Sequence, residues 1–138
     1  MIEIIAVLVI LGILSAVVAV KMSGTSDYDL ASQVEVVKNH LRYAQIRAMN
    51  TDTNWGINFT SPEQYNLFEV VGSTPTARLL PGEDNATVIL TNKSKLTITP
   101  PTGGSVTFDS YGSPGAETIT IETTGGTITV TQNTGFIP

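Results

Sequence analysis

The sequence predicts an α+β fold in which one long amino-terminal helix precedes an antiparallel β-sheet. Three observations carry this prediction: an apolar segment at residues 4–20, an apolar stripe with helical spacing after it, and short alternating segments beyond residue 53. A chain of 138 residues needs only one globular domain. We therefore divide it into a hydrophobic transmembrane or filament-core helix at 1–22 and a periplasmic or extracellular globular domain at 23–138.

The apolar segment at residues 4–20 contains no formally charged side chain, and Lys21 follows it. At 1.5 Å per residue, a helix of about 17 residues spans roughly 26 Å, which is near the thickness of the hydrocarbon core of a membrane. A cleavable signal peptide would place basic residues before the apolar segment, whereas Met1-Ile2-Glu3 stands there. We expect an uncleaved membrane anchor.

Glu3 is the one charged side chain among the first 20 residues. A charge in the middle of a membrane costs about 2.5–3.5 kcal/mol by insertion scales, and less near the interface. One interpretation places Glu3 at the level of the lipid headgroups, where the positive end of the helix dipole favours it. The other interpretation gives Glu3 a positively charged partner.

The order Ile-Glu-Ile-Ile-Ala-Val-Leu-Val-Ile-Leu-Gly-Ile-Leu at residues 2–14 resembles the class III amino terminus of type IV pilins and type II secretion pseudopilins. Mature chains of that family commonly begin Phe-Thr-(Leu or Met)-Ile-Glu. On this match Met1 is the third mature residue, so the resemblance implies that two residues and a short basic leader are missing from the sequence.

This resemblance implies a pilin fold and a structural role. Prepilin peptidase would process the subunit, the inner membrane would hold it, and the pilus or secretion assembly machinery would insert it into a helical homo-oligomer, an extracellular filament on the cell surface. Glu3 would pair with the amino-terminal amine of a neighbouring subunit, which neutralises both charges in the filament core. Gly12 stands where the family often has a helix-weakening glycine.

A second, amphipathic part of the helix is predicted at 27–49, ended by Asn50-Thr51. Between the two parts, we expect the helix to loosen near Gly12 or around Ser23-Gly24-Thr25, where helix propensity is poor. We expect its apolar stripe to pack on the sheet of the same chain rather than on helices of other subunits. The stripe consists of Leu30, Val34, Val37, Leu41, Ala44 and Ala48.

The β-rich part is predicted at 54–138. The Gly125-Gly126 pair permits the positive φ angles of a primed hairpin turn between the last two strands, and residues 72–84 read as a loop that faces outward. The candidate strands are Trp55–Phe59, Tyr65–Val71, Thr87–Leu90, Lys95–Thr99, Ser105–Phe108, Thr118–Glu122 and Thr127–Thr131. Residues 30–137 resemble the H-type minor pseudopilins and the T-type minor pilins, through Leu41–Ala48, Phe108–Gly112 and the closing Thr134–Ile137.

Catalytic chemistry has little support in the composition, because the chain has one histidine and no cysteine. We expect no enzyme activity, no cofactor and no metal. His40 lies off the apolar stripe, and we interpret it as a solvated helix residue. The run Glu83-Asp84-Asn85 offers oxygen ligands for calcium but lacks the alternating pattern of a calcium loop, so a plain polar turn is the favoured interpretation.

The net charge of −5 and a carboxyl-terminal region without basic residues disfavour a nucleic-acid partner. The predicted function is that of a structural subunit of a type IV pilus-like filament. A minor pseudopilin of a type II secretion system is the alternative within the same class. A membrane-tethered binding module that does not polymerise is the rival from another class.

Overall fold

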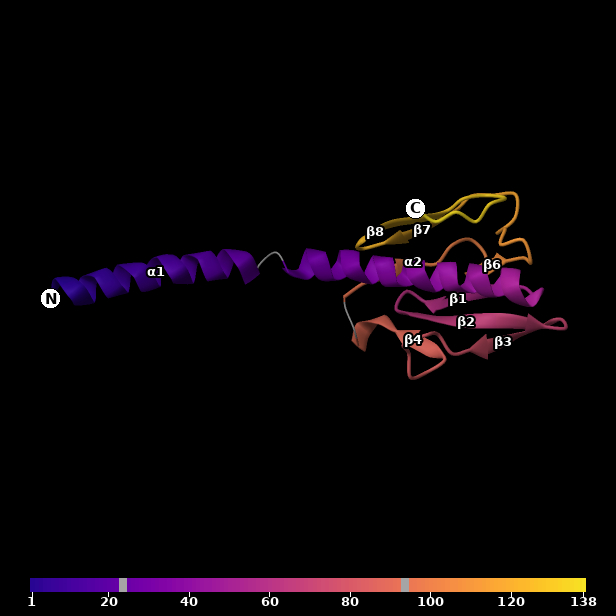
Figure 1. Cartoon of the computed structure of the whole chain (residues 1–138), viewed down its shortest axis with the longest axis horizontal. Helices are drawn as coiled ribbons and strands as arrows, with labels where there is room; N and C mark the ends of the chain where they lie inside the picture. Colours follow the sequence, from indigo (N-terminus) through magenta and orange to yellow (C-terminus); the bar gives the residue numbers. More distant parts are fainter. Residues whose placement is uncertain (23–24, 93–94) are drawn as a thin grey trace.

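Two consecutive helices and a set of strands make up the computed structural model, which describes residues 1–22, 25–92 and 95–138. The helices α1 (Ile2–Met22) and α2 (Thr25–Thr51) come first, and all strands follow (Figure 1). The predicted order of helix before sheet is confirmed. Of the predicted break around Ser23-Gly24-Thr25, Ser23 and Gly24 lie outside the described residues, and Thr25 already belongs to α2.

The carboxyl end of α2 lies beyond the predicted end of the helix. Asn50 and Thr51, the residues expected to end it, are still helical. The Thr51 hydroxyl donates a hydrogen bond to the Arg47 carbonyl oxygen at 2.7 Å, so it satisfies an acceptor in the last turn. Asp52 then adopts a φ of 53°, the left-handed conformation that often ends a helix. The helix therefore stops by backbone reversal at Asp52.

The larger of two sheets has five strands in the order β3-β2-β1-β6, with β4 also pairing along β2. Every pairing is antiparallel, as the alternating sequence pattern predicts. The short helix η1 (Leu90–Asn92) follows β4. The strands are β1 (Trp55–Ser61), β2 (Gln64–Val71), β3 (Thr74–Arg78), β4 (Thr87–Ile89) and β6 (Ser105–Phe108).

The strand β3 lies within residues 72–84, so the prediction of a loop there is wrong for residues 74–78. All five side chains of β3 are exposed, and an exposed strand carries no alternation of apolar and polar residues. Backbone pairing with β2 holds β3 in place, and Gly72 adopts a φ of 67° in the turn between them. Its strand character comes from this pairing and not from a buried face.

The smaller sheet contains β5 (Ile98–Thr99), β7 (Ile119–Thr123) and β8 (Gly126–Val130), in the order β5-β7-β8. The predicted hairpin of β7 and β8 is confirmed, with Thr123 opposite Gly126. The prediction of a primed turn is wrong, because Gly126, with a φ of 137°, is the only residue of this turn that has a positive φ. Gly125 is needed for space instead: a Cβ atom there would lie 2.9 Å from the Leu30 carbonyl oxygen and 2.9 Å from Cγ2 of Val34 on α2.

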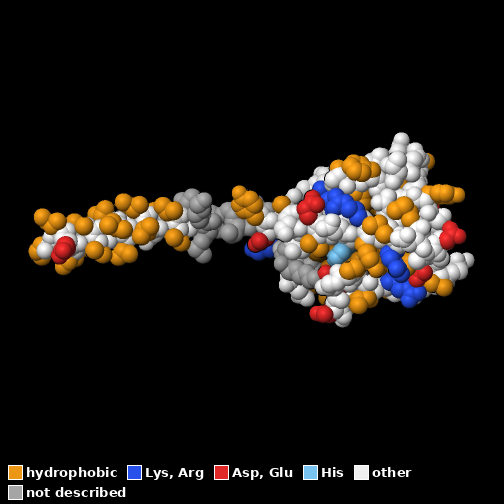
Figure 2. Space-filling view, in the orientation of Figure 1, with side chains coloured by type: hydrophobic (Ala, Val, Ile, Leu, Met, Phe, Trp, Pro, Cys, Tyr) orange, Lys and Arg blue, Asp and Glu red, His pale blue; other side chains and the backbone are white. Residues whose placement is uncertain are grey.

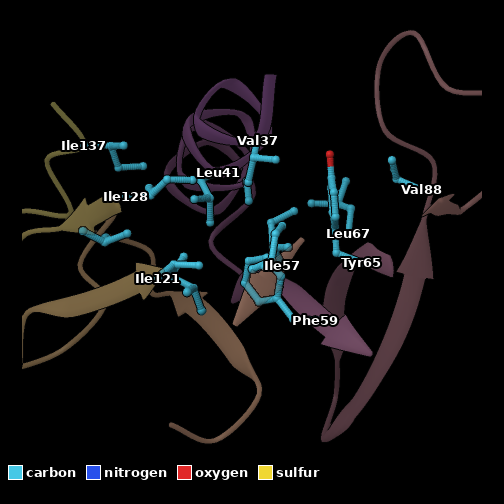
Figure 3. Close-up of a cluster of buried hydrophobic side chains, with 14 of the residues drawn as sticks. Val37, Leu41, Ile57, Phe59, Tyr65, Leu67, Val88, Ile121, Ile128 and Ile137 are labelled. Carbon is cyan, nitrogen blue, oxygen red and sulfur yellow. The ribbon is translucent and has the colours of Figure 1, made fainter. Parts of the chain in front are cut away.

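The core lies between α2 and the inner faces of both sheets, as Figure 3 shows for Val37 and Leu41 of α2, Ile57 and Tyr65 of the larger sheet and Ile121 of the smaller one. Five members of the predicted stripe are buried, and the sixth, Leu30, is half-buried against the same cluster. The expected packing of the stripe on the sheet of the same chain is confirmed. Each aliphatic side chain buried there contributes about 1.5–3 kcal/mol.

His40 lies in this core, which corrects the prediction of a solvated side chain. Only 8% of its surface is exposed. Its Nδ1 atom lies 2.9 Å from the hydroxyl oxygen of Tyr65 on β2, a hydrogen-bond distance. The buried face of α2 is therefore wider than the apolar stripe. The imidazole of His40 is accommodated in the core because the Tyr65 hydroxyl is its hydrogen-bond partner.

The carboxyl-terminal segment is held on α2 by two side chains that the sequence analysis did not single out. Gln45 donates through Nε2 to the carbonyl oxygens of Gly112 at 2.8 Å and Thr134 at 3.1 Å. Arg42 donates through Nη2 to the carbonyl oxygen of Ile137 at 3.1 Å. These hydrogen bonds thus attach the carboxyl-terminal segment to α2, although the two are far apart in the sequence.

Candidate functional site: the apolar surface of α1

The side chains of α1 form a nearly continuous apolar surface that its own domain does not cover. Figure 2 shows them as the orange layer over the rod that extends from the domain. Each of twelve large aliphatic side chains is between 53% and 84% exposed. A surface of this kind marks a site of interaction with other apolar groups. They are Ile2, Ile4, Ile5, Val7, Leu8, Val9, Ile10, Leu11, Ile13, Leu14, Val17 and Val18.

Glu3 lies in the first turn of α1, at the edge of this apolar surface. Its side chain is exposed, and the free backbone N–H groups of the first turn favour a carboxylate there. Within the part of the chain that the structure describes, no salt bridge involves Glu3. The carboxylate is thus accessible to a positive group from another molecule.

Ser15 is a polar residue within the apolar surface, and its hydroxyl is hydrogen-bonded inside the helix. Its hydroxyl donates to the Leu11 carbonyl oxygen one turn earlier, at 2.7 Å. This bond satisfies the donor within the helix, which an apolar environment requires. The surface of α1 therefore presents no unpaired donor at Ser15.

Gly12 lies in the middle of α1, and the helix continues through it. A Cβ atom at this position would meet nothing within 4 Å. Because Gly12 has no side chain, the surface of α1 has a shallow depression there, where another helix can approach closely. The helix flexibility expected at Gly12 stays a prediction.

The membrane anchor expected at residues 1–22 stays a prediction. Across the described residues, no helix combines the length and the hydropathy that a membrane span requires.

The other candidate site, Glu83-Asp84-Asn85, borders a hollow of about 150 Å³ together with Gly82 and Asn92. Among the described residues, its two carboxylates are the only titratable side chains that line the hollow, and no cluster of three or more His, Cys, Asp or Glu residues suited to a metal ion occurs. Calcium prefers six to eight oxygen ligands. The interpretation of this run as a plain polar turn stays a prediction.

Comparison with solved structures gives two similar chains. A crystal structure of the minor pseudopilin EpsH from the type II secretion system of Vibrio cholerae superposes with a TM-score of 0.58 at 10% identity, over 81% of this chain and 93% of EpsH. A second EpsH structure gives 0.53 at 12% identity, over 77% and 91%. No protein-family model matches the sequence, and the search of curated proteins gave no significant match.

At such low identity, the likeness establishes the fold. The chain has the α+β fold of the minor pseudopilin, with its amino-terminal helix packed on antiparallel strands, and the predicted pilin fold is confirmed. Because nearly the whole length of EpsH is matched, the shared fold includes the globular domain as a unit.

Proposed function

We propose that this chain is a structural subunit of a filament of the type IV pilus and type II secretion class, and that it assembles through α1. The observation that carries the proposal is the combination of a pseudopilin fold with an uncovered apolar helix that begins with a single carboxylate. An enzyme needs convergent reactive groups, whereas a filament subunit needs a helix that packs against copies of itself. The role proposed is structural and not catalytic.

The twelve aliphatic side chains of α1 are exposed in the monomer. If several α1 helices pack side by side, these side chains become buried between helices. In water, burial of each would contribute about 1.5–3 kcal/mol. In a membrane the driving force would be closer contact between helices, which small residues such as Gly12 permit. We infer that the monomer is stored in the bacterial inner membrane through α1, supported by the charge-free run at residues 4–20.

Glu3 sets the register of assembly in this proposal. Once α1 enters a bundle of apolar helices, the carboxylate loses water and needs a positive partner, which the amino-terminal amine of a neighbouring subunit can supply. A subunit that is displaced along the bundle leaves a carboxylate and an amine unpaired. Only one axial position therefore satisfies both charges.

The experiment replaces Glu3 by Ala and by Gln in cells that contain the natural assembly machinery. We expect both variants to be absent from, or at least about tenfold reduced in, filaments sheared from the cell surface, while the monomer accumulates in the membrane fraction. Immunoblots of the two fractions and negative-stain microscopy measure this. Glu35→Gln is the matched control, since Glu35 is an exposed carboxylate on α2.

Incorporation of Glu3→Ala at the level of the natural chain would refute the role of Glu3 in assembly. A membrane-tethered binding module instead predicts that neither the natural chain nor Glu3→Ala occurs in any sheared fibre. Mass spectrometry of the amino terminus of the assembled chain would show which amine is available to pair with Glu3.

A minor pseudopilin of a type II secretion system is the second candidate, favoured by the likeness to EpsH. A minor subunit would be present in few copies, and its deletion would abolish secretion while the major subunit remained stable. A major subunit would instead dominate the protein content of sheared filaments. Quantitative mass spectrometry of the filament fraction therefore distinguishes the two.

A further inference from the structure

One edge of the smaller sheet is only partly paired. The strand β7 pairs with β8 along its whole length, from Ile119 to Thr123. On the other side, β5 reaches only Glu122 and Thr123. Pro100 and Pro101 follow β5, and proline has no backbone N–H to donate to a ladder. The first half of β7 therefore has an edge that β5 does not cover.

The register shows which backbone groups point to this edge. Glu122 lies opposite Thr99, and the N–H of Thr124 donates to the Thr97 carbonyl oxygen at 3.1 Å. In an antiparallel ladder, alternate residues direct their N–H and C=O groups to the same neighbour. The backbone groups of Thr120 and Thr118 consequently point outward as well. Among the described residues, no strand pairs with them there.

An open hollow of about 540 Å³ lies beside this edge. Residues 116–120 line one side of it, Pro101 and Thr102 line another, and Pro114 completes the wall. Thr118 and Thr120 are both exposed, so this edge lies at the surface of the molecule. An added strand rises about 3.3 Å per residue, so the edge at 118–120 accommodates a short extended peptide.

The charge around the hollow has one sign. Glu117 lines it, and Glu122 lies two residues beyond the edge on the same strand. Among the described residues that line it, none is a lysine or an arginine. A bound peptide with lysine or arginine side chains would gain a favourable interaction with Glu117 that an acidic peptide would not.

We propose that the outer edge at residues 118–120, formed by Thr118 and the first residues of β7, binds an extended basic peptide segment of another protein, which adds to the smaller sheet as a further strand. The backbone of Thr120 supplies one donor and one acceptor, and Glu117 selects for positive charge. Strand addition gives affinity through the main chain and specificity through alternate side chains. This binding is independent of assembly through α1, because it uses a different surface.

The experiment uses the full chain in detergent micelles and a fluorescent peptide, acetyl-Lys-Val-Thr-Val-Lys-amide, measured by anisotropy. The matched probe carries glutamate in place of both lysines. We expect the lysine peptide to bind at least about tenfold more tightly than the glutamate peptide, a difference that salt reduces. In addition, we expect the amide of Thr120 to exchange hydrogen at least about tenfold more slowly in the presence of the lysine peptide.

Two substitutions at one position separate the backbone from the side chain. Thr120→Pro removes the donor at an edge position where proline is tolerated, and should weaken binding by about tenfold. Thr120→Ala keeps the donor and should bind within about twofold of the natural chain. Glu117→Gln should reduce the preference for the lysine peptide. Trp55 fluorescence verifies that each variant is folded.

Three results would overturn the proposal. Equal binding of both peptides excludes selection by charge, and unchanged exchange at Thr120 in the natural chain excludes strand addition there, whatever the fate of the proline variant. Protection of Thr120 that rises with protein concentration without peptide assigns the edge to a second copy of the chain.

Discussion

At the residue scale, the contact between His40 and Tyr65 links α2 to β2 inside the core. The Tyr65 side chain is fully buried, and its hydroxyl oxygen lies 2.9 Å from Nδ1 of His40. Burial raises the pKa of Tyr65 above its ordinary value, and the negative charge of Glu83 raises it further. The folded protein therefore favours the neutral phenol more strongly than the unfolded chain does.

This shift in the pKa of Tyr65 predicts a loss of stability at alkaline pH. An unfolded tyrosine ionises near pH 10, whereas the folded state keeps Tyr65 neutral to higher pH. Stability is thus fully present below about pH 10 and falls above it, by up to about 1.4 kcal/mol per pH unit. Denaturant unfolding between pH 8.5 and 11.5 measures this slope.

The variant Tyr65→Phe should lose the part of the alkaline slope that Tyr65 contributes, although it is less stable at neutral pH by about 1–3 kcal/mol because His40 loses a partner. Tyr111→Phe is the matched control, since it removes an exposed hydroxyl. An alkaline slope that is equal in Tyr65→Phe and the natural chain would contradict the prediction.

Sequence patterns point to single residues as candidates where the reason is local. Glu3 is recognisable because no other charge occurs in its segment. The burial of His40 was not predictable, because its polar partner, Tyr65, is 25 residues away in the sequence. The same holds for Gln45, whose acceptors Gly112 and Thr134 are 67 and 89 residues away.

At the scale of elements, the hairpin of β7 and β8 packs its turn directly against α2. A Cβ atom at Gly125 would lie 2.9 Å from both the Leu30 carbonyl oxygen and Cγ2 of Val34. Such a contact is too short for a real Cβ atom, so the hairpin or the helix must shift. The absence of a side chain at Gly125 therefore sets the distance between the smaller sheet and α2.

We predict that Gly125→Ala destabilises the domain by about 1–3 kcal/mol, as overpacking does in other cores. In the double variant with Val34→Ala, the clash with Cγ2 is relieved but the contact with the Leu30 carbonyl oxygen remains. The two substitutions should therefore be non-additive, with a coupling of about 0.5–1 kcal/mol. Thermal and denaturant unfolding of the four proteins give this value, and strict additivity would argue against the packing described.

Elements with one buried face were predictable, and those without one were not. The stripe of α2 and the Ile/Val alternation of β7 and β8 report burial directly. The strand β3 buries nothing, and β5 retains only Ile98 and Thr99 of the five residues predicted for it. An alternation of apolar and polar residues indicates that one face of a strand is buried. Whether a segment pairs as a strand also depends on the strands next to it in the sheet.

At the scale of the whole molecule, the proposed function gives α1 and the globular domain different roles, and a substitution at Gly12 tests the role of α1 separately. A Cβ atom at Gly12 meets nothing within 4 Å, so Gly12→Ala should leave the domain unchanged and stabilise α1 by about 0.5–1 kcal/mol. If assembly uses close approach or flexibility of α1 at this position, the amount of sheared filament should fall about twofold or more.

Filament yield from Gly12→Ala cells, normalised to the monomer in the membrane, is the measurement. Ala16→Gly is a matched control, because it makes the opposite change one turn away on the same helix. Filament yield from Gly12→Ala equal to that of the natural chain would remove Gly12 from the assembly site and leave the role of Glu3 untouched. The geometry of the amine pairing proposed for Glu3 could not be predicted from one chain, since the proposed partner belongs to another molecule.

The hydrogen bonds from Gln45 and Arg42 can form only late in biosynthesis, because the donors are synthesised long before their acceptors. Gln45 leaves the ribosome 89 residues before Thr134, and Arg42 leaves 95 residues before Ile137. At about 5–20 residues per second, α2 waits roughly 5–20 seconds for these acceptors. During that interval the carboxyl-terminal segment cannot yet bind to α2, so the domain reaches its final packing only after these last residues have been synthesised.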